Sequence, residues 1–316
     1  MAVSKKRISA RKKIESTEHV KLSDTYEIDS VLKEIQKSCS GLIVPEDDSD
    51  EALIAVKDWI ELPEPIRKPI GAKGLPCPSV VVAQGKPDSG KTTFSITCMV
   101  NAQKEGASVI LLDSEDKFNW KRAKVMGLDV KKTGYFPATT IESVFDVTAK
   151  MVDVFKKHNK KALIIWDSIG ATPTKKGLAE FESGDPKELA MKRATIIREG
   201  LRSLVQVMRG TKIAFVAINH VGANMNMFGK KTTASGGSGP TYHASLILEF
   251  TRIGGAWPKK KEKGSSAAGS RVMLEVTKNH LAQPFQKNEI EVDWKGIVYD
   301  RDVEYAPEGF FDSKLD

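Results

Sequence analysis

The segment from Gly85 to Thr92, which reads GKPDSGKT, constrains the structure of this chain more than any other. Its spacing is G-x-x-x-x-G-K-[ST], in which a glycine-rich loop wraps backbone N–H groups around the phosphates of a nucleotide. The apolar run Ser79–Ala83 precedes the loop, and the helix-compatible run Thr92–Ile96 follows it. We therefore expect the loop to join a buried strand to the N-terminus of a helix and to bind phosphate there.

The residue types in this loop support the same expectation. Gly85 and Gly90 let the backbone turn where a Cβ atom would collide. Lys91 would reach the β- and γ-phosphates, and the hydroxyl of Thr92 would bind Mg²⁺. The residues expected to hold the nucleotide are Gly85, Pro87, Asp88, Ser89, Gly90, Lys91, Thr92 and Thr93.

The composition restricts the partners and the compartment that we expect. The 316 residues suffice for one large domain, and the net charge of +8 suits a polyanionic partner. No run approaches the roughly 18 apolar residues of a membrane span, and no apolar segment follows the basic N-terminus. Cys39, Cys77 and Cys98 are scattered, which favours burial as small hydrophobes and a reducing cytoplasm.

The N-terminal part of the chain is organised differently from the rest. Apolar residues recur at helical spacing over Tyr26–Lys37, an extended run follows over Gly41–Pro45, and a second helix is expected over Glu51–Asp58. Several prolines and a glycine-rich loop then mark a boundary. We expect a basic, disordered tail over 1–24, a helix–strand segment over 25–65, and a core over 66–316.

In the core, apolar runs alternate with helical patterns, which predicts an α/β fold with a mostly parallel sheet flanked by helices. The first four strands are nearly continuous apolar runs, as in a sheet covered on both faces. The later strands follow one another directly, so the sheet should end in antiparallel strands. The expected strands are Ser79–Gln84, Ser108–Asp113, Leu163–Asp167, Ile213–Asn219, Ser245–Phe250, Val272–Thr277 and Glu289–Val292, and the expected helices are Lys91–Lys104, Phe118–Met126, Ile141–Lys156 and Glu188–Arg209.

Acidic residues end two of the expected strands. Asp167 follows the apolar run LIIW, and at the carboxyl end of a parallel strand it would help to hold Mg²⁺. The sequence DSED from Asp113 to Asp116 ends the strand after the phosphate-loop helix. Either Glu115 or Asp116 could act there as the base that activates water, or simply as an acid at a helix N-terminus.

Two long basic loops follow other strands of the sheet. Asn219 and His220 end one strand, and the loop 221–241 after them contains Lys230, Lys231 and several glycines. The loop 172–187 carries further lysines. Such loops could form a groove for single-stranded nucleic acid, or they could be disordered surface loops. The loop residues expected at nucleic acid are Lys175, Lys176, Lys230, Lys231, Gly236 and Gly237.

Taken together, these segments resemble the RecA-type recombinases, and especially their phage UvsX relatives. The resemblance extends from about Ile28 to Tyr299 and rests on the order and spacing of short motifs. They are the phosphate loop, the strand LDSE, the strand IIWDS, the strand AINH, the loop TTASGG and the segment TKNH that continues to QPF. The resemblance implies a RecA-like ATPase core with an N-terminal helix–strand segment that polymerises the chain.

The resemblance also implies a role for individual residues. It makes Glu115 the catalytic carboxylate, His220 the group that senses the γ-phosphate, and Arg202 a DNA contact. Lys278 and His280 would complete the ATP site of a neighbouring copy. At the position where the family stacks a tyrosine on adenine, this chain has Arg122, which could stack as a guanidinium with altered nucleotide preference. The family's C-terminal domain is essentially missing, so how duplex DNA is captured is open.

The function expected from this resemblance is an ATP- and Mg²⁺-dependent DNA recombinase in the cytoplasm. It would form filaments on single-stranded DNA, pair it with homologous duplex DNA and exchange strands, and mediator and single-strand-binding proteins could assist it. A ring-shaped helicase or a regulatory ATPase with the same fold is an alternative, because fold alone does not determine function. A non-catalytic partner that binds ATP is a third, against which Glu115 argues.

Overall fold

The computed structural model describes residues 33–35, 37–38, 56–183, 190–223, 232–234, 239–259 and 266–307. Contacts divide the chain into two units, Met1–Ala55 and Val56–Asp316. In the first unit the described residues are helical, and those up to Lys37 fall within the helix expected there. The expected tail over 1–24 and the extended run Gly41–Pro45 lie outside the described residues. The second unit contains the elements described below.

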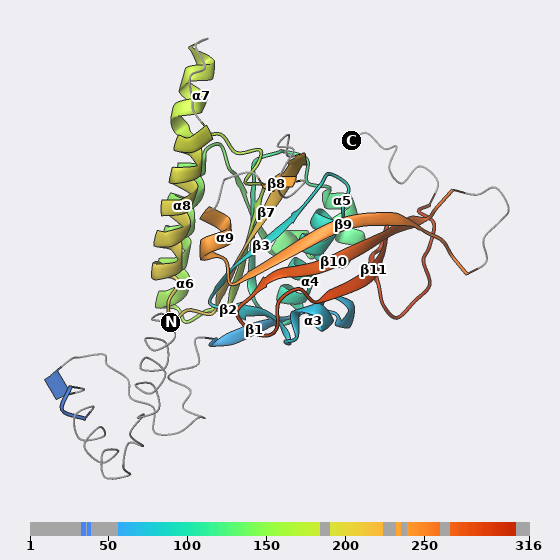
Figure 1. Ribbon diagram of the computed structural model, residues 1–316, viewed down its shortest axis with the longest axis horizontal. Coiled ribbons are helices and arrows are strands. Elements are labelled where there is room, and N and C mark those ends of the chain that lie inside the picture. The colour runs from blue at the N-terminus through green and yellow to red at the C-terminus, as the bar shows by residue number, and fades with distance from the viewer. Residues whose placement is uncertain are drawn as a thin grey trace, which may run out of the picture. The chain divides into compact units, whose positions relative to one another are not determined.

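A mostly parallel sheet forms the centre of the second unit (Figure 1). Its strands lie in the order β12-β11-β10-β9-β3-β7-β6-β4-β5, and β8 pairs with β7. The strands from β9 to β5 pair in parallel, whereas β9 to β12 pair antiparallel, which confirms the expected fold class. The strands are β3 (Ser79–Gly85), β4 (Ser108–Asp113), β5 (Thr133–Pro137), β6 (Ala162–Asp167), β7 (Ile213–Ala223), β8 (Thr232–Ala234), β9 (Leu246–Ala256), β10 (Gly269–Asn279), β11 (Lys287–Asp293) and β12 (Gly296–Val298).

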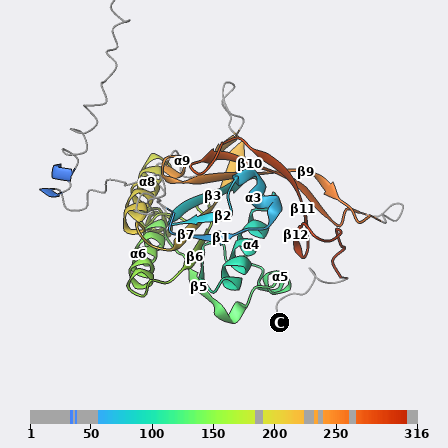
Figure 2. The ribbon, with the colours of Figure 1, turned by 90° about the horizontal axis from the view of Figure 1, so that it is seen from below.

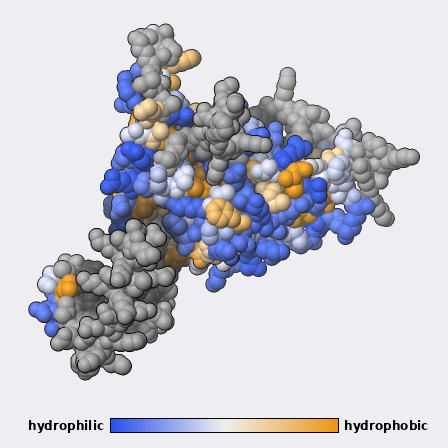
Figure 3. Space-filling model, in the orientation of Figure 1, coloured by the Kyte–Doolittle hydropathy of each residue, from blue (hydrophilic) through white to orange (hydrophobic). Residues whose placement is uncertain are grey.

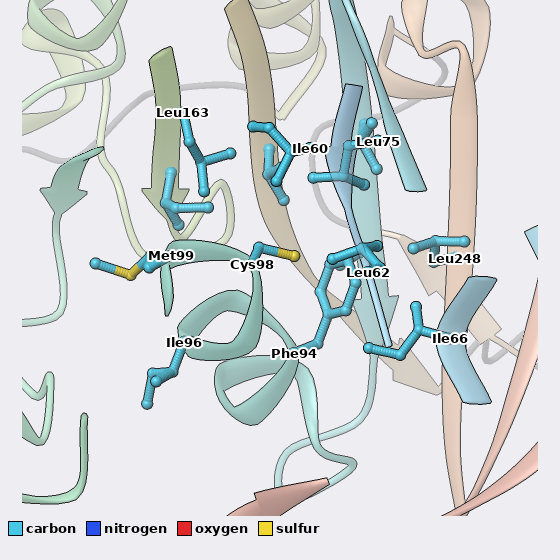
Figure 4. Packing of buried hydrophobic residues seen from close by; sticks show 14 of the residues in the cluster. Ile60, Leu62, Ile66, Leu75, Phe94, Ile96, Cys98, Met99, Leu163 and Leu248 are labelled. Carbon is cyan, nitrogen blue, oxygen red and sulfur yellow. The ribbon is translucent and has the colours of Figure 1, made fainter. Parts of the chain in front are cut away.

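Helices cover both faces of this sheet (Figure 2). On one face the core includes residues of α4 and of the short strand pair β1 (Asp58–Glu61) and β2 (Gly74–Cys77) (Figure 4). On the other face it includes residues of α6 and α8. Side chains alternate along a strand, so Val81 of β3 joins the first core and Val82 joins the second. The helices are α3 (Glu64–Ile70), α4 (Lys91–Lys104), α5 (Trp120–Val125), η1 (Val130–Lys132), α6 (Ile141–Lys157), α7 (Lys175–Glu182), α8 (Ala190–Val207) and α9 (Gly239–His243).

The hydrophilic surface and the buried cysteines are those expected from the composition. Figure 3 shows a mostly hydrophilic exterior with scattered apolar patches on this side of the molecule. Cys77 and Cys98 are buried free thiols, as expected of small hydrophobes, and Cys39 lies outside the described residues. Within the part of the chain that the structure describes, no helix is both long and apolar enough to cross a bilayer.

Three elements near the start of the core differ from the sequence-based expectations. The helix expected over Glu51–Asp58 is wrong at its end, because Asp58 opens β1 (Asp58–Glu61), which pairs with β2 (Gly74–Cys77). The boundary expected between residues 65 and 66 falls inside α3, which has Pro65 in its first turn, where proline is tolerated, and Pro69 one residue before its end. The edge strand β5 was not expected, because Gly134 and Pro137 obscure its strand pattern.

The two expected loops also contain regular structure. The first, 172–187, contains the helix α7, which Thr174 caps by accepting a hydrogen bond from the N–H of Gly177. The second, 221–241, begins with the last residues of β7, which pair with β8, and ends in the first residues of α9. Both segments are therefore more ordered at their described ends than the sequence indicated.

Candidate nucleotide-binding site

The phosphate loop lies between β3 and α4, as the sequence predicted. Gly90 has a φ of 96° and precedes the first residue of α4, so the loop enters the helix through a left-handed turn. At Gly85 a Cβ atom would lie 2.4 Å from the carbonyl oxygen of Phe250 and 2.5 Å from Oγ of Ser89. Glycine is thus required at Gly85 because a side chain would collide there, and at Gly90 because the backbone is left-handed.

A cavity of about 630 Å³ opens in front of this loop. Its lining includes every residue that the sequence assigned to the nucleotide except Gly85, together with Glu115, Asp167 and His220. These side chains come from α4, α5 and the carboxyl ends of β4, β6 and β7, where ligands of such sheets bind. The volume falls within the usual range for pockets that bind small molecules.

The side chain of Lys91 is bonded to the phosphate loop itself. The side chain is only 4% exposed, and its Nζ donates to the carbonyl oxygens of Gly85 at 2.9 Å and Lys86 at 2.6 Å. Burial lowers the pKa of Lys91, and the neighbouring carboxylates of Asp167 and Glu115 oppose that shift. Ser89 is also buried, and its Oγ makes no hydrogen bond to any described residue. Both side chains therefore suit an anionic ligand rich in acceptor oxygens.

Asp113 and Asp167 lie side by side at the ends of β4 and β6. Burial, Glu115 and Asp113 together raise the pKa of Asp167 to about 7. A divalent cation would relieve this repulsion. Across the described ranges there is no group of three or more His, Cys, Asp or Glu side chains that could hold a metal. The donors here, the carboxylate of Asp167 and the hydroxyl of Thr92, instead suit Mg²⁺ that is bound together with phosphate oxygens.

Glu115 faces the same cavity and has two partners. Its Oε1 accepts a hydrogen bond from Oγ of Ser168 at 2.7 Å and lies 3.0 Å from Nε2 of His220. Burial alone would raise the pKa of Glu115, but the hydrogen bonds from Ser168 and His220 outweigh burial and lower it. Asp116 has a φ of 53° and does not line the cavity. The geometry therefore favours Glu115 over Asp116 as the carboxylate that could accept a proton from water.

Lys278 and His280 do not line this cavity. They lie at the end of β10, where Lys278 is opposite Ile247 and Asn279 is opposite Leu246. The phosphate loop begins at the other end of the neighbouring strands, where Gly85 is opposite Phe250. Nζ of Lys278 donates to the carbonyl oxygens of Thr241 at 2.8 Å and Tyr242 at 3.0 Å. Burial and Lys278 lower the pKa of His280.

Of the residues expected to contact DNA, Lys175 and Lys176 lie on α7 and Arg202 lies on α8. Lys176 forms an exposed ion pair with Glu180 at 3.3 Å, and the backbone N–H of Lys175 donates to Glu142. Arg202 on α8 is largely exposed and lies 3.7 Å from Glu199. The remaining predicted DNA contacts, Lys230, Lys231, Gly236 and Gly237, lie outside the described residues. Exposed cations on helices are available for phosphate, but they also suit an ordinary solvated surface.

Several residues in the cavity lining, or bonded to it, were not anticipated from the sequence. Ser168, which binds Glu115, directly follows Asp167, but a serine after a strand carries no signal of its own. Arg252 comes from β9, which pairs with β3. This pairing depends on the order of the strands in the sheet and not on spacing along the sequence. Asp293 and Trp294 lie at the end of β11, far along the chain from the phosphate loop. Only the folded sheet brings these residues together.

Comparison with known proteins gives several relatives that carry the same name. The chain is 29% identical over 224 residues to "Protein RecA" of Streptomyces avermitilis, which covers 71% of this chain and 56% of that protein. It is 29% identical to "Protein RecA" of Cytophaga hutchinsonii, covering 71% of this chain and 60% of that protein. With the protein of the same name from Ureaplasma parvum it shares 27% identity, covering 75% and 69%. The chain spans a little over half the length of the first of these relatives.

The family described as the RecA N-terminal domain matches residues 27–299. This range includes the phosphate loop, the acids of β4 and β6, His220 and the whole sheet. The match agrees with the strand order and with the cavity at the carboxyl ends of the parallel strands. The chain therefore belongs to the RecA family of recombinases.

Proposed function

We propose that this chain is an ATP-dependent DNA recombinase that forms filaments on single-stranded DNA and promotes homologous pairing and strand exchange. Its relatives carry the name "Protein RecA", and membership of that family makes recombination the first function to test. ATP would be the nucleotide, single-stranded and homologous duplex DNA the partners, and the cytoplasm the compartment. Mediator and single-strand-binding proteins would assist loading.

One observation carries this proposal: Glu115 contacts His220 at the point where β7 leaves the sheet. β7 continues past His220 to Ala223 and pairs there with β8. The segment between β7 and α9 is the one that the family resemblance assigns to DNA. A change in the contacts of His220 when a γ-phosphate binds would therefore act directly on the strand that leads into this segment.

Hydrolysis would proceed with the phosphates held by the loop. Lys91 would bind the β- and γ-phosphates through its ammonium group, whose present acceptors are backbone carbonyls. Mg²⁺, when bound, would neutralise charge that develops on the phosphate oxygens, and Thr92 and Asp167 would hold it. Glu115 would orient the attacking water and accept its proton, since its lowered pKa keeps it ionised near neutral pH.

The site would be completed by a second copy of the chain. Lys278 and His280 lie at the end of the sheet away from the cavity of their own copy, so they could serve only the cavity of a neighbour. A cation supplied in this way stabilises charge in the transition state, as an arginine finger does. Assembly would use the exposed edge of β5, to which the N-terminal segment of a neighbour could add a strand.

DNA would bind through its phosphates rather than through its bases. Lys175, Lys176 and Arg202, together with Lys230, Lys231, Gly236 and Gly237, would supply cations and close backbone approach. Affinity should then fall steeply as the salt concentration rises.

The substitution Glu115→Gln tests the proposal, with Asp116→Asn as the matched control on the adjacent residue. We expect Glu115→Gln to lower DNA-stimulated ATP turnover by about 10²–10⁴-fold while filaments with ATP and single-stranded DNA persist. Asp116→Asn should keep turnover within about twofold, because Asp116 does not line the cavity. Turnover, electron microscopy and a strand-exchange assay are the measurements. Closed hexamers without filaments, or a wild-type rate that DNA does not change, would contradict the proposal.

A further inference from the structure

The side chain of Arg122, which lines the nucleotide cavity, connects two elements of the fold. Its Nη2 donates to Oγ1 of Thr93 at 2.8 Å, on the helix that follows the phosphate loop. The same nitrogen donates to the carbonyl oxygen of Asp293 at 3.0 Å, and Nε donates to that of Trp294 at 3.3 Å. Arg122 therefore bridges α4 and the turn between β11 and β12.

Asp293 anchors a further segment to the same turn. Its carboxylate, whose side chain is fully buried, accepts hydrogen bonds from both terminal nitrogens of Arg301, one of them at 2.7 Å. It also accepts from the backbone N–H groups of Lys295 at 2.9 Å and Glu304 at 3.1 Å. A buried carboxylate that accepts this many hydrogen bonds is held firmly in its position. Through it, residues 301–306 are fastened beside the turn.

These elements form part of the wall of the cavity, outside the phosphate loop. Trp294 and Ala306 line the same cavity as Lys91, Glu115 and Asp167, whose charges suit phosphates and Mg²⁺. The indole of Trp294, the methyl group of Ala306 and the guanidinium of Arg122 suit the flat, weakly polar surface of a nucleoside. Arg301 itself does not line the cavity.

We propose that Arg122, Asp293 and Arg301 are positioning residues that hold the β11–β12 turn and residues 301–306 in place as the wall for the nucleoside part of the bound nucleotide. The inference deepens the proposed function and rests on its nucleotide site. Arg122 acts here through the turn, by hydrogen bonds in the plane of its guanidinium group. Arg301 acts in the same way, by holding the turn through Asp293, although Arg301 touches no ligand.

This arrangement predicts a loss of affinity that depends on the nucleoside. The phosphate loop stays intact when the wall is displaced. The affinity for a ligand that consists of phosphates alone should therefore stay the same. MgATP should bind about tenfold more weakly to Arg122→Gln and to Arg301→Gln, since each variant loses charge-assisted hydrogen bonds. Mg-tripolyphosphate should bind both variants within about twofold of the wild type. The double variant should lose less than the sum of the two single effects, because both act on one wall.

Isothermal titration of the full chain with MgATP and with Mg-tripolyphosphate makes the comparison. Arg271→Gln is the matched control, because Arg271 forms an exposed ion pair with Glu289 on the neighbouring strands and should change neither affinity. Thermal unfolding checks that each variant is folded. Should Arg301→Gln fail to fold, Arg301→Lys, which keeps a cation beside Asp293 but has one nitrogen in place of the two that bond the carboxylate, gives the same comparison.

Each outcome decides a different claim. A loss of affinity for MgATP but not for Mg-tripolyphosphate, in both variants, supports the proposed wall. Equal losses of affinity for both ligands, no loss for either ligand, or a loss in Arg122→Gln without one in Arg301→Gln would overturn it. The last result would mean that Arg122 acts on the base directly. Wild-type protein that binds neither ligand would overturn the proposed nucleotide site itself, and the inference with it.

Discussion

The two ends of the central sheet differ in how much of a site each contains. At the carboxyl ends of β3, β4, β6 and β7 there is a cavity whose lysine is buried and already bonded to the loop. At the opposite end, Lys278 and His280 lie near the surface, with carbonyl oxygens of Thr241 and Tyr242 as the partners of Lys278. Under the proposed function, the first end would bind the nucleotide, and the second end would supplement the site of a neighbouring copy.

This difference indicates how the activity of the chain could depend on assembly with other copies. Since β10 runs antiparallel to β9, its final residues are carried away from the cavity that its first residues help to line. A complete site would then need the cavity end of one copy and the lysine end of another. Folding alone would give binding, and polymerisation would add turnover.

The largest effect should come from comparing Lys91→Ala with Lys278→Ala. Lys91→Ala removes the cation that binds the phosphates, so MgATP affinity should fall by about 100-fold or more. Lys278→Ala should leave binding to a single copy unchanged, because Lys278 does not line the cavity, and should lower DNA-stimulated turnover by about 10²–10³-fold. Calorimetry and an ATPase assay measure the two quantities.

Mixing variants sharpens the same comparison. Lys91→Ala and Lys278→Ala damage different halves of the site, so a mixed filament contains interfaces in which both halves are intact. Turnover in the mixture should exceed that of either variant alone. If the mixture remains as inactive as its components, the ends of the sheet do not serve each other in trans.

A smaller effect is expected on stability at the cavity end. The pKa of Asp167 is raised to about 7, so the folded protein binds more protons than the unfolded chain between about pH 4 and pH 7. The free energy of unfolding of the nucleotide-free protein should therefore fall as the pH rises through this window. Asp167→Asn should remove that dependence and stabilise the protein at pH 7.5 by on the order of 2 kcal/mol.

Denaturant unfolding at pH 5 and pH 7.5, with and without MgATP, measures this effect. The variant should gain less stability from MgATP than the wild type does, since it lacks a ligand for Mg²⁺. Equal pH dependence in both proteins would show that Asp167 is not the strained carboxylate of the cavity. Asp146→Asn, at an exposed ion pair on α6, serves as the control.

The smallest effect should appear at the lysine end, through His280. Burial and Lys278 lower the pKa of His280, so the imidazole is neutral at pH 7.5 and gains its charge only as the pH falls below its ordinary value near 6.5. His280→Lys should raise DNA-stimulated turnover at pH 7.5 by about two- to fivefold and flatten the pH profile. Turnover from pH 5.5 to pH 8 tests this, and an unchanged profile would exclude His280 from the site in trans.

Local patterns allowed much of the core to be predicted. The expected strands at Ser108–Asp113 and Leu163–Asp167 match β4 and β6 to within one residue, since continuous apolar runs identify buried parallel strands. The helix Lys91–Lys104 agrees fully with α4. The weakly patterned strand β5 was missed because its pairing with β4 stabilises it more than its local propensity does. The helix α7 was missed because it lies inside a basic segment that was expected to be a loop, and none of its residues is buried.

What the sequence determined by itself is the chemistry that depends on neighbouring residues: the phosphate loop, the strand before it, the helix after it and the acid that ends β6. Spacing along the chain is enough for these features, because each lies within one turn or one strand. Only the tertiary structure decided that Ser168 and His220 share Glu115, and that Arg122 bridges Thr93 to Asp293, which lies 171 residues after Arg122 in the sequence. Such contacts depend on strand order and on long-range packing, which no local spacing encodes.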